Sequence, residues 1–279
     1  MITGLLLRSP DRSATTPRVA AACELVDERV EGDVRLRRVR YRGADGAIVP
    51  AVVLQPATLA TPAPAVVLQH GANTSKDDYY IQAPARRWAK QGWTVLAIDL
   101  AEHGERAPAS PPTDPLIRRR LVTKPAFVKQ SVGDLSAGVD LLTATPGVDP
   151  GRVGYAGFSL GGMLGTVFTA GEPRIRAAAI VIAGSFAYQR YWERGTADER
   201  ERRRRAAEAT DPAFFAGAIA PRPFLMVNTT DDPIFPREAV ETLFAAAGEP
   251  KELRWRPGTH HQWGAGIYKD VFSFLAAAL

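Results

Sequence analysis

The stretch GYAGFSLGGMLG, residues 154–165, places one serine among closely spaced glycines. A short apolar segment typical of a strand precedes the serine, and a segment typical of a helix follows it. Glycine has no Cβ, so a cluster of glycines indicates a sharp turn or a close approach of neighbouring segments. Two interpretations compete: a plain strand-to-helix turn, or a nucleophile, Ser159, presented on a strained bend.

The segments on both sides of this stretch alternate between strand and helix patterns. Eight strands are expected, of which the first two form an antiparallel hairpin around GADG: residues 34–41, 47–56, 65–69, 94–100, 152–157, 177–184, 222–228 and 251–257. Helical patterns lie between the later strands, which predicts βαβ units and a mostly parallel sheet. We therefore predict an α/β fold, with a central sheet of about eight strands flanked by helices.

The domain organisation expected is a single domain over residues 1–279. We see no linker, but residues 185–220 interrupt the strand–helix rhythm and are long enough to form a small helical cap. Loops and insertions of this kind often lie over functional sites. The first twenty or so residues carry no clear period, and we expect a peripheral helix or arm there.

The composition excludes several classes of protein. No apolar run approaches the roughly 18 residues of a transmembrane helix, so we expect no membrane association. The N-terminal sequence lacks a secretory pattern, and Cys23 is the single cysteine, so no intramolecular disulfide is expected. These features predict a cytoplasmic protein, and homodimerisation is compatible with them.

A net charge of +5 raises the question of a nucleic-acid partner. The strongest basic run, ADERERRRRAAEATD at residues 197–211, alternates its arginines with acids spaced three or four residues apart. This spacing is typical of a solvated helix with surface ion pairs. No aromatic residues alternate with these arginines, as single-strand binding requires. We predict no nucleic-acid partner.

A serine nucleophile needs a base and an acid that orients the base. The loop after the strand at 222–228 offers Asp231 and Asp232, and the loop after the strand at 251–257 offers His260 and His261. The carboxyl ends of parallel strands meet at one edge of the sheet, where ligands bind. Three such features in order at three strand ends favour the nucleophile interpretation, while each doubled residue leaves the register open by one.

Two backbone amides are candidates to bind an oxyanion. The Leu160 amide stands at the N-terminus of the helix that follows Ser159. His70 and Gly71 close the strand at 65–69, and the Ala72 amide after them is the second candidate donor. For the His70 side chain we expect a role in propping this loop by hydrogen bonds.

The motifs LQHGANTSKDDY, VLAIDLAEHGER, VGYAGFSLGG, APRPFLMVNTTDDPIFP and PGTHHQW together resemble the α/β-hydrolase superfamily. The resemblance is closest to small serine esterases of the dienelactone-hydrolase and acetyl-xylan-esterase type. It implies Ser159 as nucleophile, Asp232 as acid, His260 as base and the amides of Ala72 and Leu160 as oxyanion donors. Asp231 and His261 stay as register alternatives.

The function expected is hydrolysis of a small-molecule carboxylic ester through an acyl-enzyme on Ser159. The alternatives are an amide or thioester hydrolase or an acyltransferase with the same residues, or a non-catalytic ligand-binding protein on this scaffold. No cofactor is expected, and no metal, because the histidine spacing of metal sites is missing. Candidate pocket residues are Tyr188, Tyr191, Trp192 and Trp263, with core packing as the competing interpretation.

Overall fold

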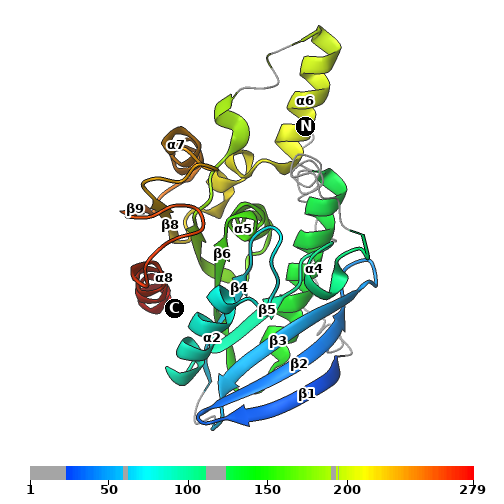
Figure 1. The fold of residues 1–279 in the computed structure, drawn as a ribbon, viewed down its shortest axis with the longest axis vertical. Helices are drawn as coiled ribbons and strands as arrows, with labels where there is room; N and C mark the ends of the chain where they lie inside the picture. The colour runs from blue at the N-terminus through cyan, green and yellow to red at the C-terminus, as the bar shows by residue number, and fades with distance from the viewer. Residues whose placement is uncertain (1–22, 59–61, 111–123, 190–192, 194) are drawn as a thin grey trace.

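The centre of the protein is a nine-stranded sheet, seen in a computed structural model that describes residues 23–58, 62–110, 124–189, 193 and 195–279 (Figure 1). The strand order is β1-β2-β3-β5-β4-β6-β7-β8-β9. The strands are β1 (Glu24–Glu31), β2 (Val34–Arg42), β3 (Ile48–Pro56), β4 (Ala63–Gln69), β5 (Thr94–Ile98), β6 (Val148–Phe158), β7 (Ile175–Val181), β8 (Phe224–Thr229) and β9 (Lys251–Arg256).

The sheet is antiparallel at one end and parallel over the rest. β1 pairs with β2, β2 with β3, and β3 with β5 in antiparallel register, which includes the hairpin expected from the sequence. The strands from β5 to β9 in the sheet order are all parallel, and β6 lies between β4 and β7. The loops after β4, β6, β7, β8 and β9 therefore leave the sheet at a common edge. The α/β fold predicted from the sequence is confirmed.

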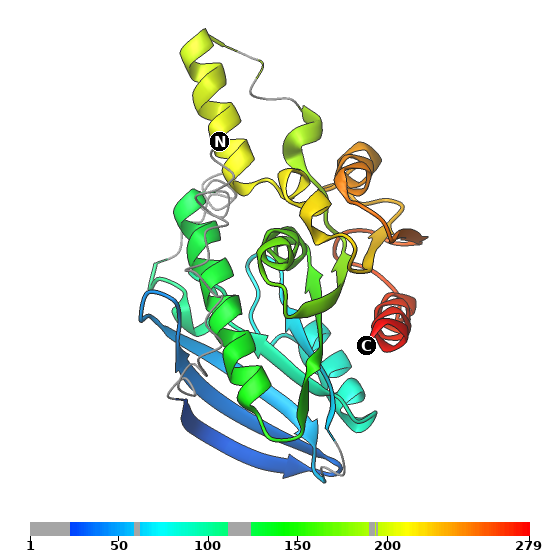
Figure 2. The ribbon, with the colours of Figure 1, turned by 180° about the vertical axis from the view of Figure 1, so that it is seen from behind.

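Helices cover both faces of the sheet (Figures 1 and 2). Alternate residues of a buried strand point to opposite faces. In β4, Val66 and Leu68 join the core on one face and Val67 joins the core on the other. The first face is covered by α2 (Tyr79–Lys90) and α8 (Gly266–Ala278), and the second by α4 (Pro125–Ala144), α5 (Leu160–Gly171) and α7 (Arg237–Ala246).

The segment between β7 and β8 contains short 3-10 turns and one long helix, α6 (Ala197–Thr210). α6 extends away from the sheet and its covering helices in both views (Figures 1 and 2). Among the described residues of α6, only Ala207 is buried, and Thr196 begins the helix with a capping box. Arg204 pairs with Glu208 and Arg205 with Glu201, so this helix has the surface ion pairs expected for residues 197–211.

No helix in the described ranges is both long enough and apolar enough to cross a membrane.

The sheet has one strand more than the eight expected, because the sequence of β1 carries no strand pattern. All eight residues of β1 are exposed, so apolar and charged residues do not alternate between a core and a solvent face.

Candidate active site

Ser159 lies at the turn between β6 and α5, at the centre of the parallel part of the sheet. Its backbone has φ 52° and ψ −114°, in the left-handed half of the map that only a few per cent of non-glycine residues adopt. The Ser159 amide donates to the Val181 carbonyl at the end of β7, 2.9 Å away. The turn is thus held at a strained conformation by the neighbouring strand, and the side chain of Ser159 remains partly exposed.

The glycines around Ser159 are required by close packing. A Cβ at Gly157 would lie 2.4 Å from the Gly161 carbonyl oxygen, and one at Gly161 would lie 2.6 Å from the His70 carbonyl oxygen. Real Cβ atoms essentially never come this close to backbone atoms. Glycine at both positions lets β6, α5 and the end of β4 approach one another, which explains the glycine cluster of residues 154–165.

His260 connects Ser159 to Asp232. Its Nε2 lies 2.9 Å from Ser159 Oγ, and its Nδ1 lies 2.8 Å from Asp232 Oδ2. An ionised carboxylate can only accept hydrogen bonds, so Nδ1 carries the proton of the neutral ring. Nε2 is then the acceptor for the Ser159 hydroxyl. This arrangement can take a proton from the serine and hold the resulting positive charge beside the carboxylate.

Asp232 is the acid of this chain of hydrogen bonds. Its side chain is fully buried, and its Oδ1 accepts hydrogen bonds from the backbone amides of Ile234 (2.8 Å) and Phe235 (3.0 Å). Burial alone would raise the pKa of the Asp232 carboxyl. The hydrogen bonds from His260 and from the two amides outweigh that effect and hold the pKa below its usual range. The carboxylate is therefore charged at neutral pH.

The register alternatives from the sequence lie outside this chain of hydrogen bonds. Asp231 is exposed, and its carboxylate accepts a hydrogen bond from the neighbouring Thr230 hydroxyl at 2.8 Å. His261 is exposed as well and packs edge-on against the ring of His260, with 5.0 Å between the ring centroids. The structure brings together Ser159, Asp232 and His260.

The two candidate oxyanion donors lie beside Ser159. The Leu160 amide is at the first position of α5, one of the amides at a helix start that have no carbonyl partner within the helix. Ala72 follows Gly71, which packs directly on the serine: a Cβ at Gly71 would lie 3.2 Å from Ser159 Cβ. Ala72 packs against the apolar cluster that contains Leu160.

The loop that carries Ala72 is held by buried polar groups. The His70 ring is buried, with Nδ1 2.7 Å from the Gly71 carbonyl oxygen, while Nε2 accepts a hydrogen bond from the Leu100 amide at 3.2 Å. Burial lowers the pKa of His70 to about 4, so the ring is neutral at neutral pH. His70 thus props the loop, as expected from the sequence.

Sequence reasoning missed Lys76, which anchors the far end of the same loop. Its side chain is 1% exposed, and its ammonium contacts Asp99 at 2.9 Å, Glu105 at 2.7 Å and Asp77 at 3.0 Å. The sequence contained a signal for this contact, because Lys76 lies in the loop after β4 and Asp99 directly follows β5. Strand-end residues of opposite charge in neighbouring parallel strands can meet at the shared edge.

Of the four candidate pocket residues, the structure describes the side chain of Trp263. Tyr191, Trp192 and the side chain of Tyr188 lie outside the described residues. Trp263 is half-buried, stacks on Phe158 with 6.0 Å between ring centroids, and donates from its indole to the Tyr268 hydroxyl at 3.3 Å. Its described contacts are thus with the core under Ser159.

A buried carboxylate connects the start of the segment between β7 and β8 to the C-terminal end of α6. Asp211 accepts hydrogen bonds from the Ser185 hydroxyl (2.5 Å) and from the amides of Phe186 (2.9 Å) and Ala213 (3.0 Å). The Phe186 ring stacks on Phe235, which brings the start of this segment next to the Asp232 loop.

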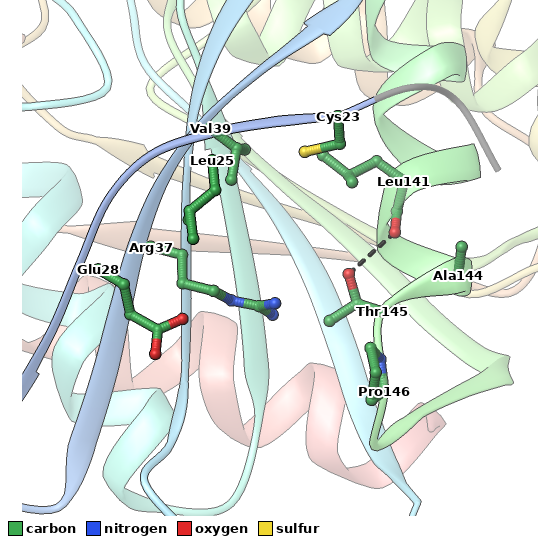
Figure 3. A pocket seen from close by; sticks show the side chains of 9 residues that line it. All are labelled: Cys23, Leu25, Glu28, Arg37, Val39, Leu141, Ala144, Thr145 and Pro146. Carbon is green, nitrogen blue, oxygen red and sulfur yellow. Dashed lines mark hydrogen bonds between the residues drawn. The ribbon is translucent and has the colours of Figure 1, made fainter.

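A cavity of about 310 Å³ lies away from Ser159, between the β1–β2 edge and the C-terminal end of α4 (Figure 3). The figure shows Arg37 and Glu28 from the strands facing Thr145 and Leu141 from the helix end, where the Thr145 hydroxyl bonds the Leu141 carbonyl (2.9 Å). None of these lining residues belongs to the Ser159 site.

Among the described residues, no group of three or more His, Cys, Asp or Glu could hold a metal ion.

The sequence matches the model of the dienelactone hydrolase family over residues 49–265, a span that contains Ser159, Asp232 and His260. The chain belongs to the dienelactone hydrolase family. This membership confirms the resemblance that the motifs around residues 68–263 indicate. A comparison of this family member with curated proteins finds no significant match.

Solved structures share the fold of this dienelactone hydrolase family member. Acetyl xylan esterase from Paenibacillus sp. R4 is 19% identical with a TM-score of 0.74, over 93% of this chain and 89% of that one. A cold-adapted esterase from an Arctic intertidal metagenomic library is 24% identical, with a TM-score of 0.71 over 91% and 98%. A protein described as a putative dienelactone hydrolase from Klebsiella pneumoniae subsp. pneumoniae MGH 78578 is 18% identical, with a TM-score of 0.66 over 88% and 98%. At these identities the likeness concerns the fold.

Proposed function

We propose that this protein is a serine hydrolase that cleaves a carboxylic ester of a small or medium-sized substrate. The observation that carries the proposal is the continuous chain from Ser159 Oγ through the His260 ring to Asp232, with both distances below 3 Å. Membership of the dienelactone hydrolase family supports hydrolysis as the reaction. The similar folds include proteins named as esterases, which supports an ester as the substrate.

In the proposed reaction, Ser159 Oγ attacks the ester carbonyl carbon and His260 Nε2 takes the serine proton. The carbonyl oxygen becomes an oxyanion, which the amides of Ala72 and Leu160 bind. Asp232 stabilises the imidazolium while the charge lasts. The tetrahedral intermediate then releases the alcohol, which receives the proton from His260, and leaves an acyl group on Ser159.

The second half of the reaction uses the same groups. A water molecule takes the position of the alcohol, and His260 removes one of its protons as the water oxygen attacks the acyl carbon. Collapse of the second intermediate returns the proton to Ser159 Oγ and releases the carboxylic acid. No cofactor is needed in this sequence of steps.

The experiment compares the Ser159→Ala and Ser273→Ala variants with the wild type. Ser273 lies exposed on α8, outside the site, and serves as the matched control. Each protein is treated with a fluorophosphonate probe and assayed on p-nitrophenyl esters from acetate to octanoate. We expect Ser159→Ala to lose labelling and at least about a thousandfold in kcat, because the covalent route is gone.

The same assay decides between substrate classes. A matched amide and thioester measured beside the best ester report whether the ester is preferred in kcat/KM. A wild-type protein that is neither labelled nor active on any of these esters would contradict the proposed function. Activity retained in Ser159→Ala at more than a few per cent would contradict the assignment of the nucleophile.

A further inference from the structure

The peptide unit between Gly71 and Ala72 is fixed from one side by two hydrogen bonds. The Gly71 carbonyl oxygen lies 2.7 Å from His70 Nδ1 and accepts a hydrogen bond from the Thr74 hydroxyl at 2.9 Å. Since the Leu100 amide donates to Nε2 of the neutral His70 ring, Nδ1 carries the proton and donates. The Gly71 carbonyl and the Ala72 N–H belong to one planar trans unit and point in opposite directions. Fixing the carbonyl therefore fixes the direction of the Ala72 N–H.

The Tyr80 hydroxyl holds the other end of Gly71. It accepts a hydrogen bond from the Gly71 amide at 2.7 Å, and it lies 2.7 Å from the Thr74 hydroxyl oxygen. The Thr74 proton goes to the Gly71 carbonyl, so the Tyr80 proton goes to Thr74 Oγ. The four groups form a closed ring: Gly71 N–H to Tyr80, Tyr80 to Thr74, and Thr74 to the Gly71 carbonyl. Every donor in the ring is satisfied, and such chains of hydrogen bonds strengthen one another.

The position of Tyr80 is itself set by residues next to the site. Tyr80 is the second residue of α2, and its ring packs edge-on against Phe158 and Trp263, with centroid distances of 5.5 and 6.0 Å. Phe158 precedes Ser159, and Trp263 follows His260 by three residues. Burial raises the pKa of Tyr80 to about 12, so its hydroxyl keeps its proton at neutral pH.

Gly71 packs so closely on Ser159 that a small movement of Gly71 would change the surroundings of the serine. A Cβ at Gly71 would lie 3.2 Å from Ser159 Cβ and 3.3 Å from the Phe158 carbonyl oxygen. The same Cβ would lie 3.6 Å from the Tyr80 hydroxyl oxygen, so the glycine held by this ring of hydrogen bonds packs directly on the nucleophile turn. Loss of the Tyr80 hydroxyl would leave the buried Gly71 amide without its acceptor and remove the hydrogen bond to Thr74, which loosens the Gly71–Ala72 peptide unit.

We propose that Tyr80 is a positioning residue for ester hydrolysis: through Thr74 and Gly71 its hydroxyl aims the Ala72 amide at the oxyanion. This inference rests on the proposed function. Tyr80 acts through the backbone, so its contribution is specific to the step in which the oxyanion forms. Substrate binding in the ground state, where no oxyanion exists, is largely independent of it.

The test compares Tyr80→Phe with Tyr79→Phe, which removes the same hydroxyl from the neighbouring residue. Tyr79 is 86% exposed and is the matched control. We expect Tyr80→Phe to lose about 10- to 100-fold in kcat with KM changed less than about twofold, somewhat less than deletion of a whole oxyanion donor. Affinity for an alkyl trifluoromethyl ketone, whose adduct on Ser159 carries the oxyanion, falls by the same factor. The pH profile of kcat/KM keeps its shape, and Tyr79→Phe matches the wild type.

A second pair of variants covers the case in which Tyr80→Phe does not fold. Thr74→Val removes the hydroxyl that links Tyr80 to the Gly71 carbonyl, and Thr74→Ser restores it. We expect a loss of kcat and of ketone affinity in the first and recovery in the second.

The inference is overturned if Tyr80→Phe and Thr74→Val keep wild-type kcat, or if kcat falls while ketone affinity does not. Neither result affects the proposed function, because the wild-type protein and its Ser159 labelling are measured in the same series. A wild-type protein inactive on all esters overturns both.

Discussion

The ring of Phe235 lies 5.7 Å from the ring of His260, with the two planes inclined by 44°. The backbone amide of Phe235 donates a hydrogen bond to Asp232 Oδ1 at 3.0 Å. Phe235 therefore contacts His260 with its side chain and Asp232 with its main chain. On its other side the ring stacks on Phe186 at 5.4 Å, at the start of the segment that leads to α6. One buried phenylalanine thus couples the orientation of two proposed catalytic groups.

Replacement of this ring is expected to affect both stability and turnover. In Phe235→Leu the amide that binds Asp232 remains, while the ring contacts to His260 and Phe186 are lost. We expect a loss of about 1–2 kcal/mol in the free energy of unfolding, typical of a reduced core side chain. We expect kcat to fall several-fold because the imidazole is less constrained. Phe214→Leu, at a 40% exposed ring, is the control. Equal effects at both positions would contradict the coupling.

The doubled residues allow a direct test of register. Asp232→Asn should lower kcat by about three to four orders of magnitude, because an amide at this position no longer fixes the Nδ1–H tautomer or stabilises the imidazolium. Asp231→Asn should change kcat less than about twofold. His260→Gln and His261→Gln should divide in the same way. Steady-state kinetics on one p-nitrophenyl ester measure all four variants, and similar mild losses throughout would place acid and base elsewhere.

His70 is expected to make stability depend on pH in the acid range. Burial lowers the pKa of His70 to about 4 in the folded protein, whereas a histidine in an unfolded chain titrates near about 6.5. Below pH of about 6.5 the unfolded chain binds a proton that the folded chain does not, so stability falls as pH drops towards about 4. Burial also lowers the pKa of His103, which adds to the same effect.

The measurement is urea unfolding at about pH 7.5 and pH 5 for the wild type and for His70→Asn. We expect the wild type to lose up to about 2 kcal/mol more than the variant between the two pH values. Groups remote from His70 titrate alike in both proteins and cancel in the comparison, whereas the neighbouring His103, with 5.5 Å between the ring centroids, contributes to the difference. An identical pH dependence in the two proteins would show that His70 does not stay neutral in the fold.

The arginines of α6 are expected to contribute little to the reaction. A variant with Arg202, Arg203, Arg204 and Arg205 replaced by glutamine loses the exposed pairs of Arg204 with Glu208 and of Arg205 with Glu201. Exposed pairs contribute about 0–1 kcal/mol each, so we expect a small decrease in melting temperature and unchanged kcat on a neutral ester. Salt titrations of binding to a DNA oligonucleotide are the counter-test. Tight, salt-sensitive binding that the variant loses would indicate a polyanion site.

Much of this site follows from the positions of residues at strand ends. Ser159, the Asp231–Asp232 pair and the His260–His261 pair each follow a segment with a strand pattern, and parallel strands bring their carboxyl ends together. The choice within each pair depends on which way a loop side chain points. Asp232 points inward because the amides of Ile234 and Phe235 turn back to bind it. That turn is a tertiary feature with no periodic signal.

Other parts of the molecule could not be read from patterns for physical reasons. Strand β1 lies at the edge of the sheet with β2 as its neighbouring strand, and all eight of its residues are exposed, so its sequence ELVDERVE carries no alternation. The role inferred for Tyr80 depends on a hydroxyl reaching back from α2 to Gly71, and nothing in the helix pattern marks it. For Trp263 the sequence allowed two interpretations, because an aromatic residue near a site has the same sequence pattern whether it lines a pocket or packs on Phe158.

The backbone of Ser159 also restricts which chemistry this scaffold can acquire. At φ 52° the side chain must be unbranched at Cβ, because β-branched residues are strongly disfavoured in the left-handed region. Threonine, which other enzymes use as a nucleophile, is branched at Cβ and is therefore a poor substitute here. Cysteine keeps the unbranched Cβ and exchanges oxygen for sulfur. At this turn, a change from serine to cysteine is therefore expected to be tolerated more easily than a change from serine to threonine.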